Sequence, residues 1–268
     1  MTDDEQRARA TRWQLAASAP EVYAEHLVPA IFAPWAPVLL DAAGVGPGDV
    51  VLDVACGTGV VAAAAAERVG STGRVTGVDV NAGMLAVAAA RTRRVRWVQA
   101  DAARLPFPDG GFDRVTCQAG LQFVPDRLGA AREMRRTLRP GGRVALLVWR
   151  ALHHSPGFAA LVDALQAVVG PDAAAVMRAP FVFGDDPRPL TSLLESAGFG
   201  EVDVQVRVSV VRFGSIEAFV RCQRAGSPLA AHVDIRHEAD LIAYVEARAP
   251  AVFPIEAAVA TGLAEVGE

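Results

Sequence analysis

Between Gly48 and Trp149 the chain alternates short apolar runs, rich in β-branched residues, with longer segments of helical periodicity. Five runs predict buried strands: VVLDVA, RVTGVDV, VRWVQA, FDRVTCQA and GRVALLVW. Strands that alternate with helices in this way predict a parallel sheet with helices on both faces. The pattern therefore predicts a doubly wound α/β sandwich with right-handed crossovers.

The segments between these runs carry helix boundary signals. GVVAAAAAERVG is a good helix former, and Gly70 is positioned to stop it. Asn81 is the expected N-cap of NAGMLAVAAARTR. PDRLGAAREMRRTLRPGG has an apolar stripe at Leu128, Met134 and Leu138, and we expect its helix to stop at residues 140–142.

After Trp149 the pattern changes. Residues 151–190 have a helix-like middle flanked by Pro and Gly, which predicts an insertion that folds over the carboxyl edge of the sheet as a lid. A helix that ends near Gly198 and a strand of alternating valines over 202–210 resume the sheet pattern, and a helix is expected over 215–223. The segment VFPIEAAVATGLA fits a last strand, but its alanine content leaves that open.

Composition and charge narrow the class of protein. The chain has 268 residues, 52% of them hydrophobic, which is enough for a large buried core. A net charge of −4 provides no general basic field for nucleic acid. We interpret the arginine cluster at residues 91–96 as the solvated end of a helix. The start of the chain lacks the order of a signal peptide, and no uninterrupted apolar stretch approaches the roughly 20 residues of a membrane span. We therefore expect a cytoplasmic protein without a membrane span.

The cysteines give no sign of a disulfide framework or a metal site. Cys56, Cys117 and Cys222 are far apart in sequence and have no metal-ligand spacing. They are expected to be reduced and to act as small apolar side chains, and no metal is predicted.

The strongest chemical signal is the stretch VLDVACGTGVVA. Gly57, Gly59 and Ala62 fit the dinucleotide pattern G-x-G-x-x-G/A, and Asp79 lies 20 residues after Gly59, where a ribose-binding carboxylate is expected. The turn by itself does not distinguish NAD from another adenosine cofactor. It does predict that the backbone approaches a ligand closely at the end of a strand.

Two further carboxylates change this picture. Asp53 lies inside the first strand, where burial is costly unless the carboxylate is paired, and Asp101 directly follows the third strand. Together with Asp79 they suit a ligand with an amino group, a ribose and an adenine. They suit a pyrophosphate poorly, because no Lys or Arg stands beside the glycines. Asp101 could also simply cap the helix that follows.

Four segments in order, VLDVACGTG, GVDVNAGML, QADAARLPFPDGGFD and LRPGGRVALLVW, resemble class I S-adenosylmethionine-dependent methyltransferases. The sequences of these motifs are most similar to the ubiquinone and menaquinone biosynthesis type of methyltransferase and its natural-product relatives. The resemblance implies a Rossmann-like, seven-stranded, mostly parallel sheet in the order 3-2-1-4-5-7-6. It implies one methyltransferase domain over 1–268, which consists of cap helices (1–47), a cofactor core (48–150), and lid segments (151–190 and 212–250).

The resemblance also implies a set of cofactor contacts. Asp79 would bind the ribose, Asp101 and the Ala102 N–H the adenine, and Asp53 with its turn the methionine part. The full implied set is Tyr23, Asp53, Ala55, Gly57, Gly59, Asp79, Val80, Met84, Asp101, Ala102, Gln118 and Gln122. In this set Val80 and Met84 pack on the adenine, Tyr23 closes over the cofactor, and Gln118 is favoured over Gln122 as a contact near the methyl group.

The implied activity is methyl transfer from S-adenosylmethionine to carbon, oxygen or nitrogen of a small molecule, such as a quinone, a phenol or a natural-product intermediate, with S-adenosylhomocysteine as product. His153 and His154 follow the fifth strand and are the candidate general bases, although a His pair in a loop is often merely exposed. Phe158, Phe181 and Phe183 fit either an aromatic acceptor or the lid's own core. A nicotinamide-dependent oxidoreductase and a cofactor-binding relative with other chemistry remain the alternatives, and a monomer and a homodimer are equally open.

Overall fold

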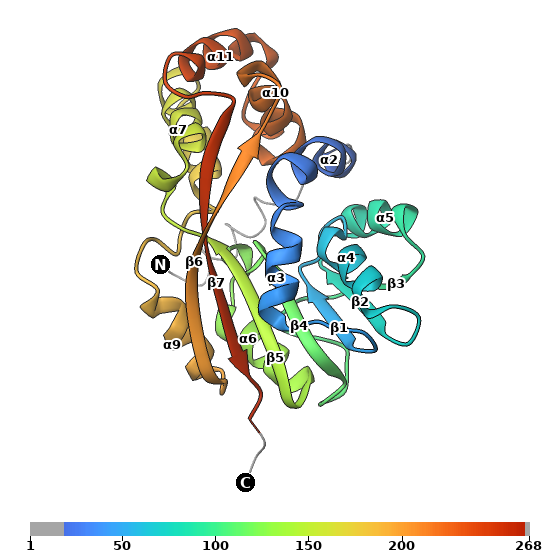
Figure 1. The fold of residues 1–268 in the computed structure, drawn as a ribbon. Coiled ribbons are helices and arrows are strands. Elements are labelled where there is room, and N and C mark those ends of the chain that lie inside the picture. The colour runs from blue at the N-terminus through green and yellow to red at the C-terminus, as the bar shows by residue number, and fades with distance from the viewer. Residues whose placement is uncertain (1–18, 266–268) are drawn as a thin grey trace. The chain divides into compact units, whose positions relative to one another are not determined.

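The computed structural model describes residues 19–265, and its seven strands form one sheet in the order β3-β2-β1-β4-β5-β7-β6 (Figure 1). The strands are β1 (Val50–Val54), β2 (Arg74–Asp79), β3 (Val95–Gln99), β4 (Phe112–Gln118), β5 (Leu138–Trp149), β6 (Gly200–Arg212) and β7 (Val252–Leu263). β1 pairs in parallel with both β2 and β4, and β2–β3 and β4–β5 are also parallel. The predicted α/β fold and strand order are confirmed.

The last strand runs against its neighbours. Ala264, just after β7, exchanges backbone hydrogen bonds with residues 141 and 142 of β5, and Phe213, just after β6, donates to Ala251, just before β7. The segment whose strand character the sequence left open is therefore an antiparallel strand. The predicted helix stop at 140–142 was a few residues late, because the helix ends at Thr137 and Pro140 already belongs to β5.

Two helix boundaries lie at the expected signals. Gly70 follows the last residue of its helix with a φ of 69°, and the Asn81 side chain accepts a hydrogen bond of 3.1 Å from the Met84 N–H. The helices and helical turns are α2 (Ala19–Val22), η1 (Tyr23–Phe32), α3 (Trp35–Ala43), α4 (Val60–Val69), α5 (Ala82–Arg91), η2 (Leu121–Phe123), α6 (Arg127–Thr137), η3 (Leu152–His154), α7 (Pro156–Val168), α8 (Pro171–Arg178), α9 (Arg188–Ser196), α10 (Ile216–Gly226), η4 (Pro228–Ala231), η5 (Ile235–His237) and α11 (Glu238–Glu246).

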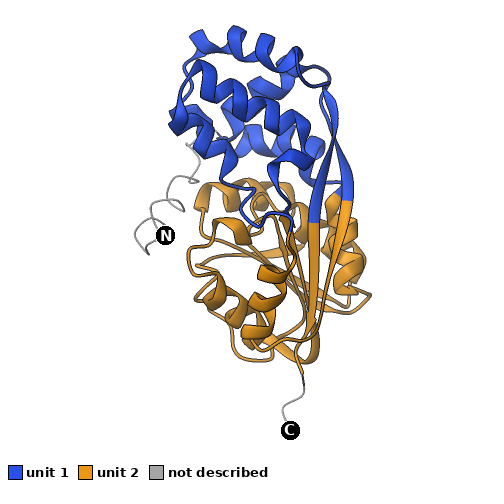
Figure 2. Cartoon of the chain, turned by 90° about the vertical axis from the view of Figure 1, so that its left-hand side faces the viewer, with its two compact units in different colours: residues 1–34, 149–185, 208–257 blue, residues 35–148, 186–207, 258–268 orange. Residues whose placement is uncertain are grey.

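The described residues divide into two compact units (Figure 2). The sheet unit comprises residues 35–148, 186–207 and 258–265, and the helical unit comprises residues 19–34, 149–185 and 208–257. The division into cap, core and lid stays a prediction, and its first eighteen residues lie outside the described part of the chain.

The helical unit has its own aromatic core. Phe158 lies 5.3 Å from Phe219 and 5.8 Å from Phe253, measured between ring centroids, and all three side chains are buried. A Cβ on Gly157 would lie 2.2 Å from the Phe253 ring, so this packing requires glycine there. The sequence left Phe158 open as a contact to an aromatic acceptor or as a residue of the lid's own core. The structure supports the core interpretation.

The continuous helical stretch Ala19–Ala43 meets a length and hydropathy criterion for a membrane span, and half of its most apolar window is buried. Core helices of proteins without membrane segments meet the same criterion, so this is weak evidence for a span. Glu21, Glu25 and His26 interrupt the stretch, in keeping with the expectation that no uninterrupted apolar run is present there.

Candidate cofactor site

The sheet unit contains a topological switch point between β1 and β4, because β2 and β3 continue the sheet on one side and β5 on the other. Ligands of open α/β sheets bind at the carboxyl ends of the strands at such a point. Ala55 follows β1 with a φ of 55° and Ala119 follows β4 with a φ of 50°, a conformation that L-residues seldom adopt. Backbone strain of this kind gathers at functional sites.

The two glycines of the turn after β1 differ in their surroundings. Gly57 has a φ of 54°, and a Cβ there would meet no atom within 4 Å. At Gly59 a Cβ would lie 2.4 Å from Cη2 of Trp97 on β3. The sequence interpretation assigned both glycines to ligand approach, but at Gly59 the packing of Trp97 already requires glycine. Gly57 is the position that leaves space for a ligand.

Asp53 is buried, with 1% of its surface exposed, and the fold supplies its partners. Its carboxylate accepts a hydrogen bond of 2.9 Å from the Thr116 hydroxyl and one of 3.1 Å from the Ala62 N–H. The expectation that a ligand supplies the partner was therefore incomplete. Burial raises the pKa of Asp53 to about 7; the two hydrogen bonds oppose this rise and the charge of Asp79 adds to it.

This pKa predicts that the contribution of Asp53 to the stability of the unliganded protein falls as the pH rises from about 4 to about 7. In that window the unfolded chain, with Asp53 near its ordinary pKa of 3.8, releases a proton that the folded chain retains. The contribution of Asp53 is full below the lower value and lost above the upper one, with a slope of at most about 1.4 kcal/mol per pH unit. Urea unfolding at several pH values gives the free energy of unfolding as a function of pH. This free energy should fall less steeply with pH for Asp53→Asn than for the wild type. Equal slopes would contradict the assignment, and Asp240→Asn, an exposed carboxylate, serves as the control.

Asp79 fastens the glycine turn to the end of β2. One carboxylate oxygen accepts the Gly57 N–H at 2.8 Å, and the other accepts the Asn81 N–H at 2.8 Å. Burial raises the pKa of Asp79 above its ordinary value. Val80, the next residue, is 58% exposed, whereas Met84 is buried in α5. The end of β2 thus presents a carboxylate and an exposed apolar surface, which suits a ribose and a flat ring.

Asp101 begins the turn after β3 and is exposed. Its carboxylate accepts a 2.9 Å hydrogen bond from the Ala103 N–H within this turn. In the described part of the chain no helix lies between β3 and β4, so the alternative that Asp101 caps a following helix was wrong. The hydrogen bond from Ala103 engages one carboxylate oxygen and is compatible with a contact to an adenine amino group from the other. Ala102 is half-buried in the same turn.

Gln118 and Gln122 lie at and after the end of β4. Gln118 is the last residue of that strand, and Gln122 stands in η2 with 2% of its surface exposed. Within residues 19–265 neither polar atom of the Gln122 amide has a hydrogen-bond partner. A buried amide without partners costs free energy that a ligand or a water would offset. The preference of the sequence for Gln118 stays a prediction, and the buried Gln122 amide is a second candidate contact.

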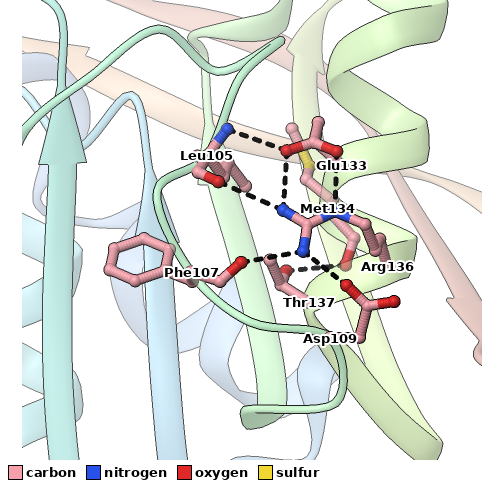
Figure 3. Close-up of polar contacts among 7 residues, drawn as sticks. All are labelled: Leu105, Phe107, Asp109, Glu133, Met134, Arg136 and Thr137. Carbon is pink, nitrogen blue, oxygen red and sulfur yellow. Dashed lines mark hydrogen bonds and ion pairs between the residues drawn. The ribbon is translucent and has the colours of Figure 1, made fainter.

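A clamp that the sequence did not suggest holds the loop between β3 and β4 (Figure 3). The Arg136 guanidinium donates to the carbonyls of Leu105 (3.1 Å) and Phe107 (2.7 Å) and to the Asp109 carboxylate (2.7 Å). Glu133 accepts from Arg136 and from the Leu105 N–H, both at 2.8 Å. The hydrogen bond from Arg136 lowers the pKa of Glu133. The clamp fixes the continuation of the turn that carries Asp101.

Removing this clamp should destabilise the sheet unit. Arg136→Ala breaks three hydrogen bonds to the loop and leaves Glu133 without its cation, at an expected cost of about 2 kcal/mol. We expect the thermal midpoint to fall by about 5 °C, as measured by calorimetry. Arg132→Ala, an exposed arginine on the same helix, should leave the midpoint unchanged. A similar midpoint for the two variants would show that the clamp does not stabilise the loop.

The helical unit carries the candidate bases. The Nε2 atom of His154 lies 2.6 Å from one oxygen of Asp185, and its Nδ1 lies 3.4 Å from Glu256. The Nε2 atom of His153 lies 3.3 Å from the other Asp185 oxygen, and its side chain is 67% exposed. Arg150 forms ion pairs with both Asp185 and Glu256. His154 is thus engaged on both ring nitrogens and His153 on one, which favours His153 as a proton acceptor.

The remaining predicted contact, Tyr23, also belongs to the helical unit. It begins η1, is half-buried, and its ring lies 5.1 Å from that of Phe32. His153, His154 and Asp185 could also hold a metal ion by the spacing of their ligand atoms, but Arg150 beside Asp185 places a positive charge next to that position.

The sheet order and the glycine turn at its switch point define a Rossmann-like α/β protein. Residues 51–142 match the family model of the methyltransferase domain. The chain is 36% identical over 186 residues to the ubiquinone/menaquinone biosynthesis C-methyltransferase of Idiomarina loihiensis, a match that covers 64% of this chain and 74% of the relative. The chain therefore belongs to the family of S-adenosylmethionine-dependent methyltransferases.

Two further comparisons agree with this family. The chain is 44% identical over 121 residues to the chloroplastic 2-phytyl-1,4-beta-naphthoquinone methyltransferase of Arabidopsis thaliana. This match covers 42% of this chain and 46% of the relative. This chain therefore spans only about half the length of several of the curated relatives that it matches. The YcgJ protein of Bacillus subtilis shares the fold, with a TM-score of 0.60 and 19% identity over 87% of this chain and 98% of that protein.

Proposed function

We propose that this chain transfers the methyl group of S-adenosylmethionine to a small-molecule acceptor and releases S-adenosylhomocysteine. The observation that carries the proposal is the turn after β1 in a chain of this family: its Gly57 faces open space and is fastened by Asp79. Family membership favours this function over the nicotinamide alternative. We also propose a cytoplasmic location and no nucleic-acid partner, in keeping with the net charge of −4.

The cofactor would be held mainly by groups at the carboxyl ends of β1 to β4. In this proposal Asp79 binds the ribose hydroxyls, and Asp101 and Ala102 bind the adenine, whose ring packs on Val80 and Met84. Asp53 keeps the turn of Ala55, Gly57 and Gly59 in place for the methionine part, and Gln118 and Gln122 supply amides near it. Tyr23 stays a predicted contact. Opposite charge on the methionine amino group would favour ionisation of Asp53.

The reaction is an in-line displacement. The acceptor's electron pair attacks the methyl carbon, the carbon–sulfur bond breaks, and the sulfur keeps the bonding electrons and loses its positive charge. The protein's share is to align the two reactants and exclude water. Where the acceptor is a phenol or quinol, its proton must leave, and we assign that proton to His153. The support is its place four residues after β5 and its contact with Asp185.

We propose an aromatic hydroxyl compound, such as a quinol, as the acceptor class. The relatives named above support it, since their printed names describe methylation in quinone biosynthesis. A phenolate ring can be methylated on carbon or oxygen, so this class agrees with two of the three acceptor atoms that the resemblance implied.

Two measurements test the proposal. In a thermal-shift experiment, S-adenosylhomocysteine should raise the midpoint and NAD should leave it unchanged. In a transfer assay with S-adenosylmethionine labelled in the methyl group, label should pass to reduced quinols and phenols and not to matched amines. Stabilisation by NAD alone would refute the function, whereas transfer only to amines would refute the acceptor class and leave the function intact.

A further inference from the structure

The outer edge of β6 is the first observation. β6 is the terminal strand of the sheet, and within residues 19–265 no strand follows it (Figure 1). Val206 is 47% exposed and Val208 is 63% exposed, although valine is favoured in strands with packed neighbours. An exposed edge strand of β-branched residues presents unpaired backbone groups that can accept another strand. β6 therefore has the properties of a pairing surface.

Within β6 the sequence EVDVQVRVS over residues 201–209 alternates polar residues with valines. It carries opposite charges at equal distances on the two sides of Gln205. Asp203, Gln205 and Arg207 share one face: the Gln205 amide donates to Asp203 at 2.7 Å and accepts from Arg207. The valines share the other face. Because the negative and positive residues stand two positions on either side of Gln205, the strand is complementary to an antiparallel copy of itself.

From this charge pattern we infer that β6 pairs with β6 of a second copy of this chain, antiparallel, around a twofold axis at Gln205. In that register Asp203 of each copy lies opposite Arg207 of the other, so one symmetric interface contains two opposite-charge pairs. On the opposite face Val204 of each copy lies opposite Val206 of the other. Both kinds of pair favour this alignment.

The neighbouring registers fit less well. A shift by two residues in one direction places Glu201 opposite Arg207, but Glu201 has a φ of 46° and departs from the extended backbone that a regular ladder needs. A shift in the other direction places Gln205 opposite Arg207 and forms no charge pair. A shift by one residue sets the charged residues opposite valines. The register about Gln205 is therefore the one that the strand specifies.

A charge-swap series tests the interface by analytical ultracentrifugation of the full chain. The wild type should show a concentration-dependent species with twice the chain mass of 28.1 kDa. Asp203→Arg and Arg207→Asp each create two like-charge pairs and should raise the dimer dissociation constant at least about tenfold. The double variant restores opposite charges and should recover the wild-type value. Asp240→Arg, an exposed swap on α11, is the matched control and should change nothing.

The outcomes separate clearly. A wild type that stays monomeric at about 100 µM overturns the inference. A dimer that both single swaps and the double swap leave equally strong would place the interface elsewhere and also overturn it. Far-UV circular dichroism of each variant shows whether the fold is retained, and the double variant keeps the test decisive because its recovery cannot come from unfolding.

Discussion

Replacing Asp79 by alanine should weaken the binding of S-adenosylhomocysteine at least about tenfold, as measured by isothermal titration calorimetry. Two losses add in this variant. The ribose loses a charge-assisted acceptor, and the turn after β1 loses the hydrogen bond that its Gly57 N–H donates to this carboxylate. Because Asn81 loses its contact as well, the start of α5 should also loosen.

The conservative variant separates these two losses. Asp79→Asn keeps one carbonyl oxygen but no charge, so its affinity should lie between those of the wild type and the alanine variant. Asp172→Ala, an exposed carboxylate on α8, should bind as the wild type does. Unchanged affinity in Asp79→Ala would refute its role in the cofactor site.

The sheet could be predicted from sequence because its signals are local. The alternation of β-branched runs and helices, the Asn81 cap and the Gly70 stop each depend on a few neighbouring residues, and all appear in the structure. The three carboxylates could be located for the same reason, since each one stands in or directly after a strand. The family motifs then supplied the order of the last strands, which periodicity does not determine.

What could not be predicted depends on contacts between distant residues. The Thr116 hydroxyl that partners Asp53 is 63 positions away, and Trp97, which requires glycine at 59, lies on another strand. The Arg136 clamp had one visible signal, the charge pair with Glu133 at three-residue spacing on a helix, but its loop contacts lie about 30 residues away. The aromatic core of the helical unit likewise joins separate segments, so spacing could not distinguish it from a substrate wall.

The second large effect is expected at the candidate base. With a phenolic or quinol acceptor, His153→Ala should lower kcat by about a hundredfold or more, the usual contribution of general acid–base catalysis, with little change in the KM for S-adenosylmethionine. The reason is that His153 has one ring nitrogen near Asp185 and a largely exposed side chain, whereas His154 is engaged on both nitrogens. His154→Ala should instead lower the thermal midpoint, because it removes contacts to Asp185 and Glu256.

The pH dependence of kcat distinguishes a base from a structural residue. A protonated imidazole cannot accept the acceptor's proton, so the wild-type rate should fall at acid pH, and this fall should be absent from the residual rate of His153→Ala. Asp185→Asn should keep the fall but lower the rate, because the carboxylate orients the ring and stabilises its cation without itself taking the proton. His232→Ala, an exposed histidine of the same unit, is the matched control. An acid fall that persists in His153→Ala but disappears in His154→Ala would transfer the role of base to His154.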